Sequence, residues 1–164
     1  MIGSEKSGYA TSKDLLFENS YYIITKSVNT SEESLKILKE LIFELKANPI
    51  IIDEEKHDYI TATISHIPHI VAAALVNLAK RLDDGNVKTL AAGGFKDITR
   101  IASASPTIWE NICAENKDEI IKVLEYLITM LKEIEDNIEK GNNVNIYNFF
   151  EEAKKYRDSF IDKK

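Results

Sequence analysis

Most of the chain carries apolar residues three and four positions apart, which is the pattern of amphipathic helices. The pattern predicts one helix after residue 30, a second from Asp53 to about Leu82, a third from Ser105 and a fourth that ends at Gly141. A last helix covers residues 146–160. The fourth helix carries its apolar residues as a narrow stripe of the kind that one helix presents to another: Ile120, Leu124, Leu127, Leu131, Ile134 and Ile138.

Strand-like sequence is confined to the N-terminal third of the chain. β-branched and aromatic residues at positions 21–25 predict a buried strand, and three isoleucines at positions 50–52 can form a second short one. A lone strand is not stable in water, so the first strand needs a sheet partner. The sequence therefore predicts an all-α, multi-helix fold over residues 31–164, preceded by a loop and a strand in residues 1–30.

Local features predict where two of the helices begin and bend. Residues 30–33 (TSEE) form a capping box, in which the Thr30 hydroxyl accepts from the Glu33 amide. Pro68 lies inside the second predicted helix, where it lacks a backbone donor and clashes with the carbonyl of Ile64. We therefore expect a kink at this proline.

The composition narrows the class of protein. The 164 residues fit one domain, and neither a membrane-spanning run nor a secretory leader is recognisable, so we expect a cytoplasmic protein that does not enter a membrane. A net charge of −6 without a basic stripe argues against a nucleic-acid partner. The single cysteine, Cys113, excludes an internal disulfide and suits a reducing compartment.

Glycine is scarce and is not arranged for phosphate binding. The six glycines form no G-x-G-x-x-G motif, and none precedes Lys-Ser or Lys-Thr. The sequence therefore has neither common motif of a nucleotide phosphate cradle.

All three histidines lie between positions 57 and 69. His66 and His69 are three residues apart and share a helix face, whereas His57, nine residues before His66, points to the opposite side of a straight helix. Three interpretations remain: a buried polar pair, a ligand-recognition site exposed by the kink at Pro68, or a metal site. The metal interpretation is the weakest, because zinc requires three or four ligands.

Arginine is rare enough to single out Arg100. The chain has eighteen lysines and three arginines. A guanidinium can bind a carboxylate through two parallel hydrogen bonds, which lysine cannot do. The alternative is a structural ion pair with Asp58 or Asp97.

Three segments in order resemble prephenate dehydrogenase over about residues 1–116. They are MIGSEKSG at residues 1–8, SHIPH at residues 65–69 with His57-Asp58 before it, and GGFKDITRIAS at residues 93–103 with Trp109 behind it. The resemblance implies an NAD(P)-dependent oxidative decarboxylation of prephenate to 4-hydroxyphenylpyruvate. It also implies that residues 1–30 are a remnant of an α/β nucleotide-binding domain and that residues 31–164 form a helical dimerisation and substrate-binding domain.

The resemblance also assigns roles to individual residues. Arg100 matches the arginine that binds a substrate carboxylate, and His69 matches a histidine of the substrate pocket, which Ser65 and His66 line or support. Other positions complete the implied substrate site. Gly93 allows the backbone to approach the ligand closely, Lys96 adds positive potential and Trp109 forms a wall of the pocket. Ser4 and Glu5 lie in the loop beside the family's catalytic histidine. The implied partners are prephenate or a similar anion and a second copy of the chain.

The chain departs from the family in two respects. The catalytic histidine of the family lies in a His-Pro pair just before the position of Met1, and the cofactor-binding motif is absent from the 164 residues. We therefore expect no catalytic residue, no tight binding of NAD or NADP and no activity in this chain alone. The alternatives are part of an arogenate dehydrogenase, a free-standing helical dimer that acts as a binding or regulatory module, and a histidine-based metal module.

Overall fold

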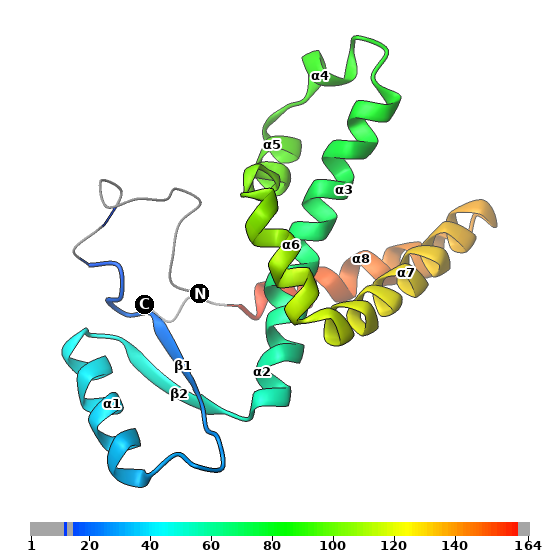
Figure 1. Ribbon diagram of the computed structural model, residues 1–164. Coiled ribbons are helices and arrows are strands. Elements are labelled where there is room, and N and C mark those ends of the chain that lie inside the picture. Colours follow the sequence, from blue (N-terminus) through cyan, green and yellow to red (C-terminus); the bar gives the residue numbers. More distant parts are fainter. Residues whose placement is uncertain (1–11, 13–14, 161–164) are drawn as a thin grey trace. The chain divides into compact units, whose positions relative to one another are not determined.

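The N-terminal part of the chain is a strand-helix-strand unit. The computed structural model describes residue 12 and residues 15–160, and within it strand β1 (Tyr21–Thr25) is followed by helix α1 (Glu32–Glu44) and strand β2 (Asn48–Ile52) (Figure 1). The two strands pair in parallel, with Tyr21 opposite Asn48 and Thr25 opposite Ile52. Both predicted strands are confirmed, and each is the sheet partner that the other needs.

A small apolar core holds this unit together. Ile24, Leu35, Ile42 and Ala47 are buried and packed against one another. Leu35 and Ile42 are seven residues apart on α1 and therefore share one face of the helix. This shared face covers the parallel strand pair, as the predicted amphipathic pattern requires.

The start of α1 corrects one prediction. Ser31, not Thr30, is the N-cap residue, and its hydroxyl accepts a hydrogen bond from the backbone N–H of Ser34 at 3.0 Å. The Thr30 hydroxyl instead accepts from the backbone N–H of Ser27. Both hydroxyls are chemically able to cap a helix, and the turn that precedes α1 decides between them.

The predicted bend at Pro68 takes the form of a π-helical turn. Helix α2 (Glu54–Thr61) continues through the π-helix η2 (Ala62–His66) into α3 (Ile67–Leu82). The N–H of Ile67 donates to the carbonyl of Ala62, five residues earlier instead of four. Because Pro68 has no N–H and would clash with the carbonyl of Ile64 in a regular helix, the wider turn relieves that conflict.

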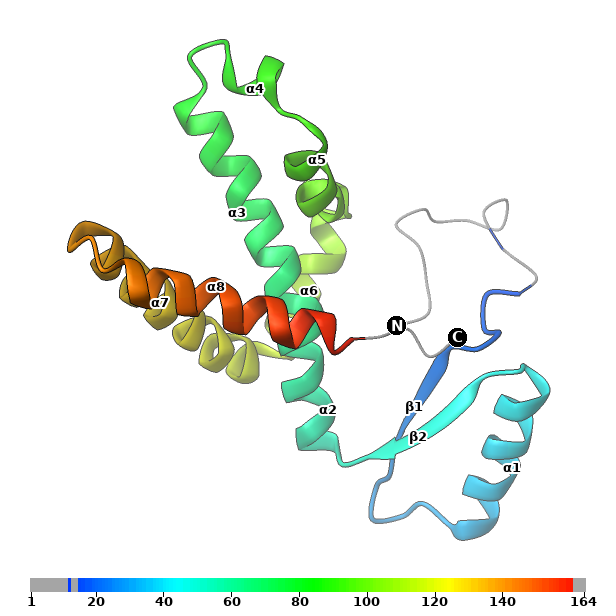
Figure 2. The same ribbon diagram turned by 180° about the vertical axis from the view of Figure 1, so that it is seen from behind.

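After α3 the chain turns back along the same helix. The Asp83 carboxylate accepts from the backbone N–H groups of Gly85 and Val87, and Gly85 adopts a φ of +102°. Such a φ favours glycine, because a side chain there would be strained. Helix α4 (Val87–Leu90), α5 (Gly93–Thr99) and the 3-10 helix η3 (Arg100–Ser103) then pack against α3, and α6 (Pro106–Glu115) follows (Figure 2).

Residues after Ile120 form a second compact unit. Helix α7 (Lys117–Glu139) ends before Gly141, which has a φ of +64°, and α8 (Asn143–Asp158) runs back beside it (Figures 1 and 2). The Asn145 amide donates to the Asn137 side-chain oxygen at 2.9 Å across this helical hairpin. The predicted fold class is confirmed, since β1 and β2 are the only strands among the described residues.

The helical stretch Glu54–Leu82 is long and unusually apolar. Within residue 12 and residues 15–160, Glu54–Leu82 is long and apolar enough to cross a membrane by length and composition, and 28% of its most apolar window is buried. Apolar helices of soluble proteins pass the same test. This stretch also carries His57, Asp58 and His66, and it packs against α5 and η3 of its own chain.

We expect Ile42→Ala to lower the free energy of unfolding of the strand-helix-strand unit by about 2–5 kcal/mol. Ile42 is 1% exposed, so its truncation leaves a cavity between α1 and the strands. Ile37 lies on the same helix and is 61% exposed, so Ile37→Ala is the matched control and should change stability by about 0.5 kcal/mol or less. Urea unfolding followed by circular dichroism compares them, and equal losses would contradict this packing.

Candidate functional site

Two histidines and a tryptophan form an aromatic cluster in the first compact unit, which ends at Ile120. The His69 and Trp109 rings are nearly parallel, at an interplanar angle of 27°, with centroids 4.0 Å apart. The His66 ring meets Trp109 edge-on, at 80° and 6.1 Å. The π turn supplies His66, α3 supplies His69 and α6 supplies Trp109, and all three side chains are partly exposed. As their spacing predicts, the two histidines reach the same partner.

The backbone of the π turn fixes the His69 ring. Its Nδ1 lies 2.9 Å from the carbonyl oxygen of Ser65. A carbonyl oxygen only accepts, so Nδ1 carries the proton and Nε2 of the neutral ring is left as an acceptor. Ser65 itself is 4% exposed and therefore acts on the stack through its backbone.

Asn116, at the end of α6, joins His66 to helix α2. Its Nδ2 donates to the backbone carbonyl of Asp58 at 2.9 Å and lies 3.2 Å from Nδ1 of His66. The partners are 58 and 50 residues away along the chain. Sequence reasoning missed this contact, because no local pattern links an asparagine to groups so distant.

The position of His57 is a correction. On a straight helix His57 would point away from His66, yet it lies near enough to lower the pKa of that ring. The extra residue in the π turn rotates the residues that follow by about 100° relative to a straight helix. The carboxylate of Asp58 contacts Nδ1 of His57 at 2.9 Å.

The surroundings of His66 favour its neutral form. Burial lowers its pKa below 6.5, and the charges of His57 and His69 lower it further, while the Asp58 carboxylate opposes them. Below pH 6.5 the unfolded chain takes up this proton more readily than the folded chain does. Above that pH His66 therefore does not reduce the free energy of unfolding. As the pH falls through the unfolded-state and folded-state pKa values of this ring, the free energy of unfolding decreases.

A cavity of about 350 Å³ lies beside the stack. His69 and Trp109 form one wall, and most of the other lining residues are small or apolar: Ile70, Ala73, Asn77, Ile101, Ala102, Ala104, Pro106 and Cys113. The volume falls in the range of small-molecule sites, roughly 300–1,000 Å³. An aromatic wall with ring nitrogens at its edge suits a cyclic, unsaturated ligand that carries polar groups.

Arg100 directly precedes two residues that line this cavity. It begins η3, is exposed, and is followed directly by the lining residues Ile101 and Ala102. Arg100 is thus placed on the same short element as the cavity wall, at a position from which a guanidinium can meet solvent-borne anions.

The other predicted residues are not all at this cavity. Lys96 lines a larger cavity of about 840 Å³ between α3, α4 and α5, together with Lys80 and Lys88. Gly93 is the first residue of α5, and no atom lies within 4 Å of the position that a Cβ would take there. Ser4 and Glu5 lie outside the described residues.

A metal or nucleotide site is not evident in the part of the chain that the structure describes. There, no group of three or more His, Cys, Asp or Glu residues could hold a metal ion. The unit β1-α1-β2 has the parallel strand pairing of a nucleotide-binding fold, but residues 26–31 between β1 and α1 contain no glycine. Residues 26–31 therefore do not fit a dinucleotide phosphate cradle.

Two family models match the chain. The model for the dimerization domain of prephenate dehydrogenase matches residues 53–152, and the model for the nucleotide-binding domain of the same family matches residues 1–51. The predicted division between residues 30 and 31 falls inside the unit β1-α1-β2 and stays a prediction.

Individual relatives agree with the family models. The prephenate dehydrogenase of Bacillus subtilis (strain 168) is 42% identical over 160 residues, which are 96% of this chain and 43% of the relative. That of Lactococcus lactis subsp. cremoris (strain MG1363) is 41% identical over 163 residues, with 97% and 44% coverage. A crystal structure of prephenate dehydrogenase from A. aeolicus, in complex with hydroxyphenyl propionate and NAD+, matches with a TM-score of 0.89 at 32% identity, over 97% of this chain and 56% of that one.

The chain thus spans less than half the length of these two curated relatives. The dimerization-domain match alone extends from residue 53 to residue 152 and so covers more than half of the 164 residues. The stack, the cavity beside it and Arg100 all lie within that matched stretch. On these grounds the chain belongs to the prephenate dehydrogenase family.

Proposed function

We propose that helices α2 to α6 form the substrate-binding part of a cytoplasmic, NAD(P)-dependent prephenate dehydrogenase, which converts prephenate to 4-hydroxyphenylpyruvate by oxidative decarboxylation. The observation that carries this proposal is the His69–Trp109 stack at the wall of the 350 Å³ cavity, inside the stretch that matches the family. The A. aeolicus relative was crystallised with hydroxyphenyl propionate, which joins a phenol ring to a carboxylate. A ligand of that class suits an aromatic wall next to an arginine.

The roles of the residues follow from their chemistry. The ring of the substrate lies against Trp109 and His69, and Arg100 binds a carboxylate through two parallel charge-assisted hydrogen bonds. Lys96 lines the other cavity, of about 840 Å³, and adds positive potential that favours a dianion from there, without contact to the ligand. Ser65 and His66 hold the stack in position, and the open side of Gly93 leaves room for close approach of the ligand.

The 164 residues are proposed to be inactive by themselves. NAD(P) is the hydride acceptor in this family. Residues 26–31, between β1 and α1, do not fit the phosphate cradle that this cofactor needs. The catalytic histidine implied by the resemblance is also not among them. In this proposal the chain binds and orients the substrate, and the remaining chemistry requires a complete nucleotide-binding domain.

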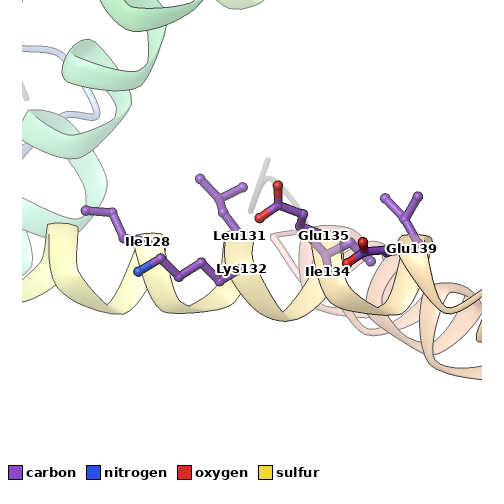
Figure 3. Close-up of a pocket in the computed structure, with 7 residues that line it drawn as sticks. Ile128, Leu131, Lys132, Ile134, Glu135 and Glu139 are labelled. Carbon is purple, nitrogen blue, oxygen red and sulfur yellow. The ribbon is translucent and has the colours of Figure 1, made fainter.

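A second copy of the chain is the proposed partner. One face of α7 carries Ile128 and Leu131 (Figure 3), and Ile138 lines the same face. The exposed fractions of Ile128, Leu131 and Ile138 are 42%, 54% and 62%. Ile134 lines the same face, and Lys132, Glu135 and Glu139 border it. An apolar stripe with charged borders is the arrangement by which two helices pair, and a match to a dimerization domain supports pairing between identical chains.

The first test concerns turnover. Purified residues 1–164 should not reduce NAD+ or NADP+ with prephenate or arogenate. The same residues fused to a complete nucleotide-binding domain of the family, with its His-Pro pair, should reduce one of the two cofactors with prephenate, as measured by fluorescence of the reduced nicotinamide. Turnover by residues 1–164 alone would contradict the proposed inactivity. A folded but inactive fusion would favour a binding module, and a preference for arogenate would select that alternative substrate.

The second test concerns Arg100. In the active fusion, Arg100→Ala should raise the KM for prephenate about 10-fold to 100-fold, because hydrogen bonds to charged groups contribute about 1.5–3 kcal/mol. Arg81→Ala, which removes another exposed arginine of the first unit, is the control and should leave KM unchanged. An unchanged KM with a lowered melting temperature in Arg100→Ala would instead show a structural ion pair.

The third test concerns the α7 face. Light scattering of the 18.6 kDa chain should give about twice that mass. Leu131→Glu places a charge on the apolar face and should shift the protein to the monomer, whereas Thr129→Glu, about 200° away on the same helix, should not. A monomeric wild-type chain, or a Leu131→Glu variant that stays dimeric, would count against this interface.

A further inference from the structure

The side-chain amide of Asn116 contacts both helix α2 and the ring of His66. Its amide nitrogen is shared between the Asp58 carbonyl, at 2.9 Å, and Nδ1 of His66, at 3.2 Å. The carbonyl of Asp58 can only accept, so the group facing it must be the amide N–H and not the amide oxygen. This contact fixes the orientation of the amide without reference to His66.

The same orientation assigns the proton on His66. With Nδ2 as the donor, Nδ1 of His66 must be the acceptor and is therefore unprotonated. The single proton of the neutral ring then lies on Nε2. His69 has the opposite arrangement, because its Nδ1 donates to the carbonyl of Ser65 and its Nε2 is the acceptor.

We propose that Asn116 is a positioning residue that holds His66 in its neutral, Nε2-protonated tautomer, so that the two histidines that contact Trp109 present one donor nitrogen and one acceptor nitrogen. The role of this pair in binding substrate rests on the proposed function. The tautomer itself does not, because it follows from the two contacts of the Asn116 amide.

The charges around His66 act in the same direction. His57 and His69 repel a proton on this ring, whereas the Asp58 carboxylate, which already contacts His57, attracts one. Acidic and basic residues at the end of α6 and the start of α7 line a pocket together with Asp58: Glu115, Lys117, Asp118 and Glu119. These charges have both signs. The Asn116 amide is a neutral group in direct contact with Nδ1 of His66, and its N–H stabilises only the unprotonated state of that atom.

The neutral tautomer has a consequence for ligand binding. A protonated His66 would place a positive charge at the edge of Trp109, whose face is stacked on His69. With His66 kept neutral, the two rings offer a ligand the Nε2–H of His66 as a donor and Nε2 of His69 as an acceptor.

The tautomer can be read directly from imidazole nitrogen chemical shifts. In the wild-type 164-residue chain above pH 7, long-range nitrogen–proton correlation spectra should show His66 protonated at Nε2 and His69 protonated at Nδ1. On acidification His66 should titrate below pH 6.5. A wild-type spectrum with the His66 proton on Nδ1 would overturn the proposal, and this outcome needs no variant.

Asn116→Asp tests the cause. A carboxylate can only accept from Nδ1, so this variant should move the His66 proton to Nδ1 and raise the titration midpoint by about one pH unit or more. Asn111→Asp is the control, because it adds the same charge at an exposed position of α6. The Asn111 side chain donates only to the carbonyl of Thr107 among the hydrogen bonds described, and this variant should leave the tautomer of His66 unchanged. Asn116→Ser, a milder change, should give a mixture of tautomers.

Three results separate this positioning role from its alternatives. If Asn116→Asp folds, as judged by circular dichroism, and neither tautomer nor midpoint changes, Asn116 does not position His66. If the tautomer changes as expected but the active fusion keeps its wild-type KM and pH profile with Asn116→Asp, the positioning is real and its role in substrate binding is rejected. A fusion that lacks activity in every form rejects the proposed function and leaves the tautomer assignment standing.

Discussion

Pro68 imposes a constraint on which the arrangement of the site depends. A proline at this position can neither donate to the carbonyl of Ile64 nor fit beside it in a regular helix. The chain responds with a π turn at Ala62–His66, closed by the bond from Ile67 to Ala62, and the helix then continues to Leu82. Such insertions occur often at functional sites, because one added residue redirects side chains without ending the helix.

The redirected side chains make the site. His66 leaves the π turn toward Asn116 and the edge of Trp109, and His69 stacks on the face of the same ring one turn later. The carbonyl that fixes His69 belongs to Ser65, which is itself part of the π turn. One backbone irregularity therefore sets two ring positions and two opposite hydrogen-bonding patterns beside a cavity of about 350 Å³.

Much of the fold was predictable because its causes are local. The spacing of Leu35 and Ile42, the strand pattern at residues 21–25 and the stop at Gly141 each depend on neighbours in the sequence. Three features were not predictable: the competition between Thr30 and Ser31 for the cap, the approach of His57 to His66, and the contact of Asn116. They depend on a preceding turn, on an inserted residue in the helix and on partners more than 40 residues away. The resemblance to the family singled out Arg100 and His69, but sequence alone could not show that Lys96 lines a different cavity.

The stack and cavity behind the π turn are proposed to bind an aromatic or cyclohexadienyl carboxylate. A crystal structure of the fusion enzyme with NAD+ and 3-(4-hydroxyphenyl)propionate is the decisive experiment. We expect the ligand ring against His69 and Trp109, with its carboxylate on the Arg100 guanidinium. A ligand bound instead in the cavity between α3 and α4, beside Lys80 and Lys88, with the stack empty, would contradict it.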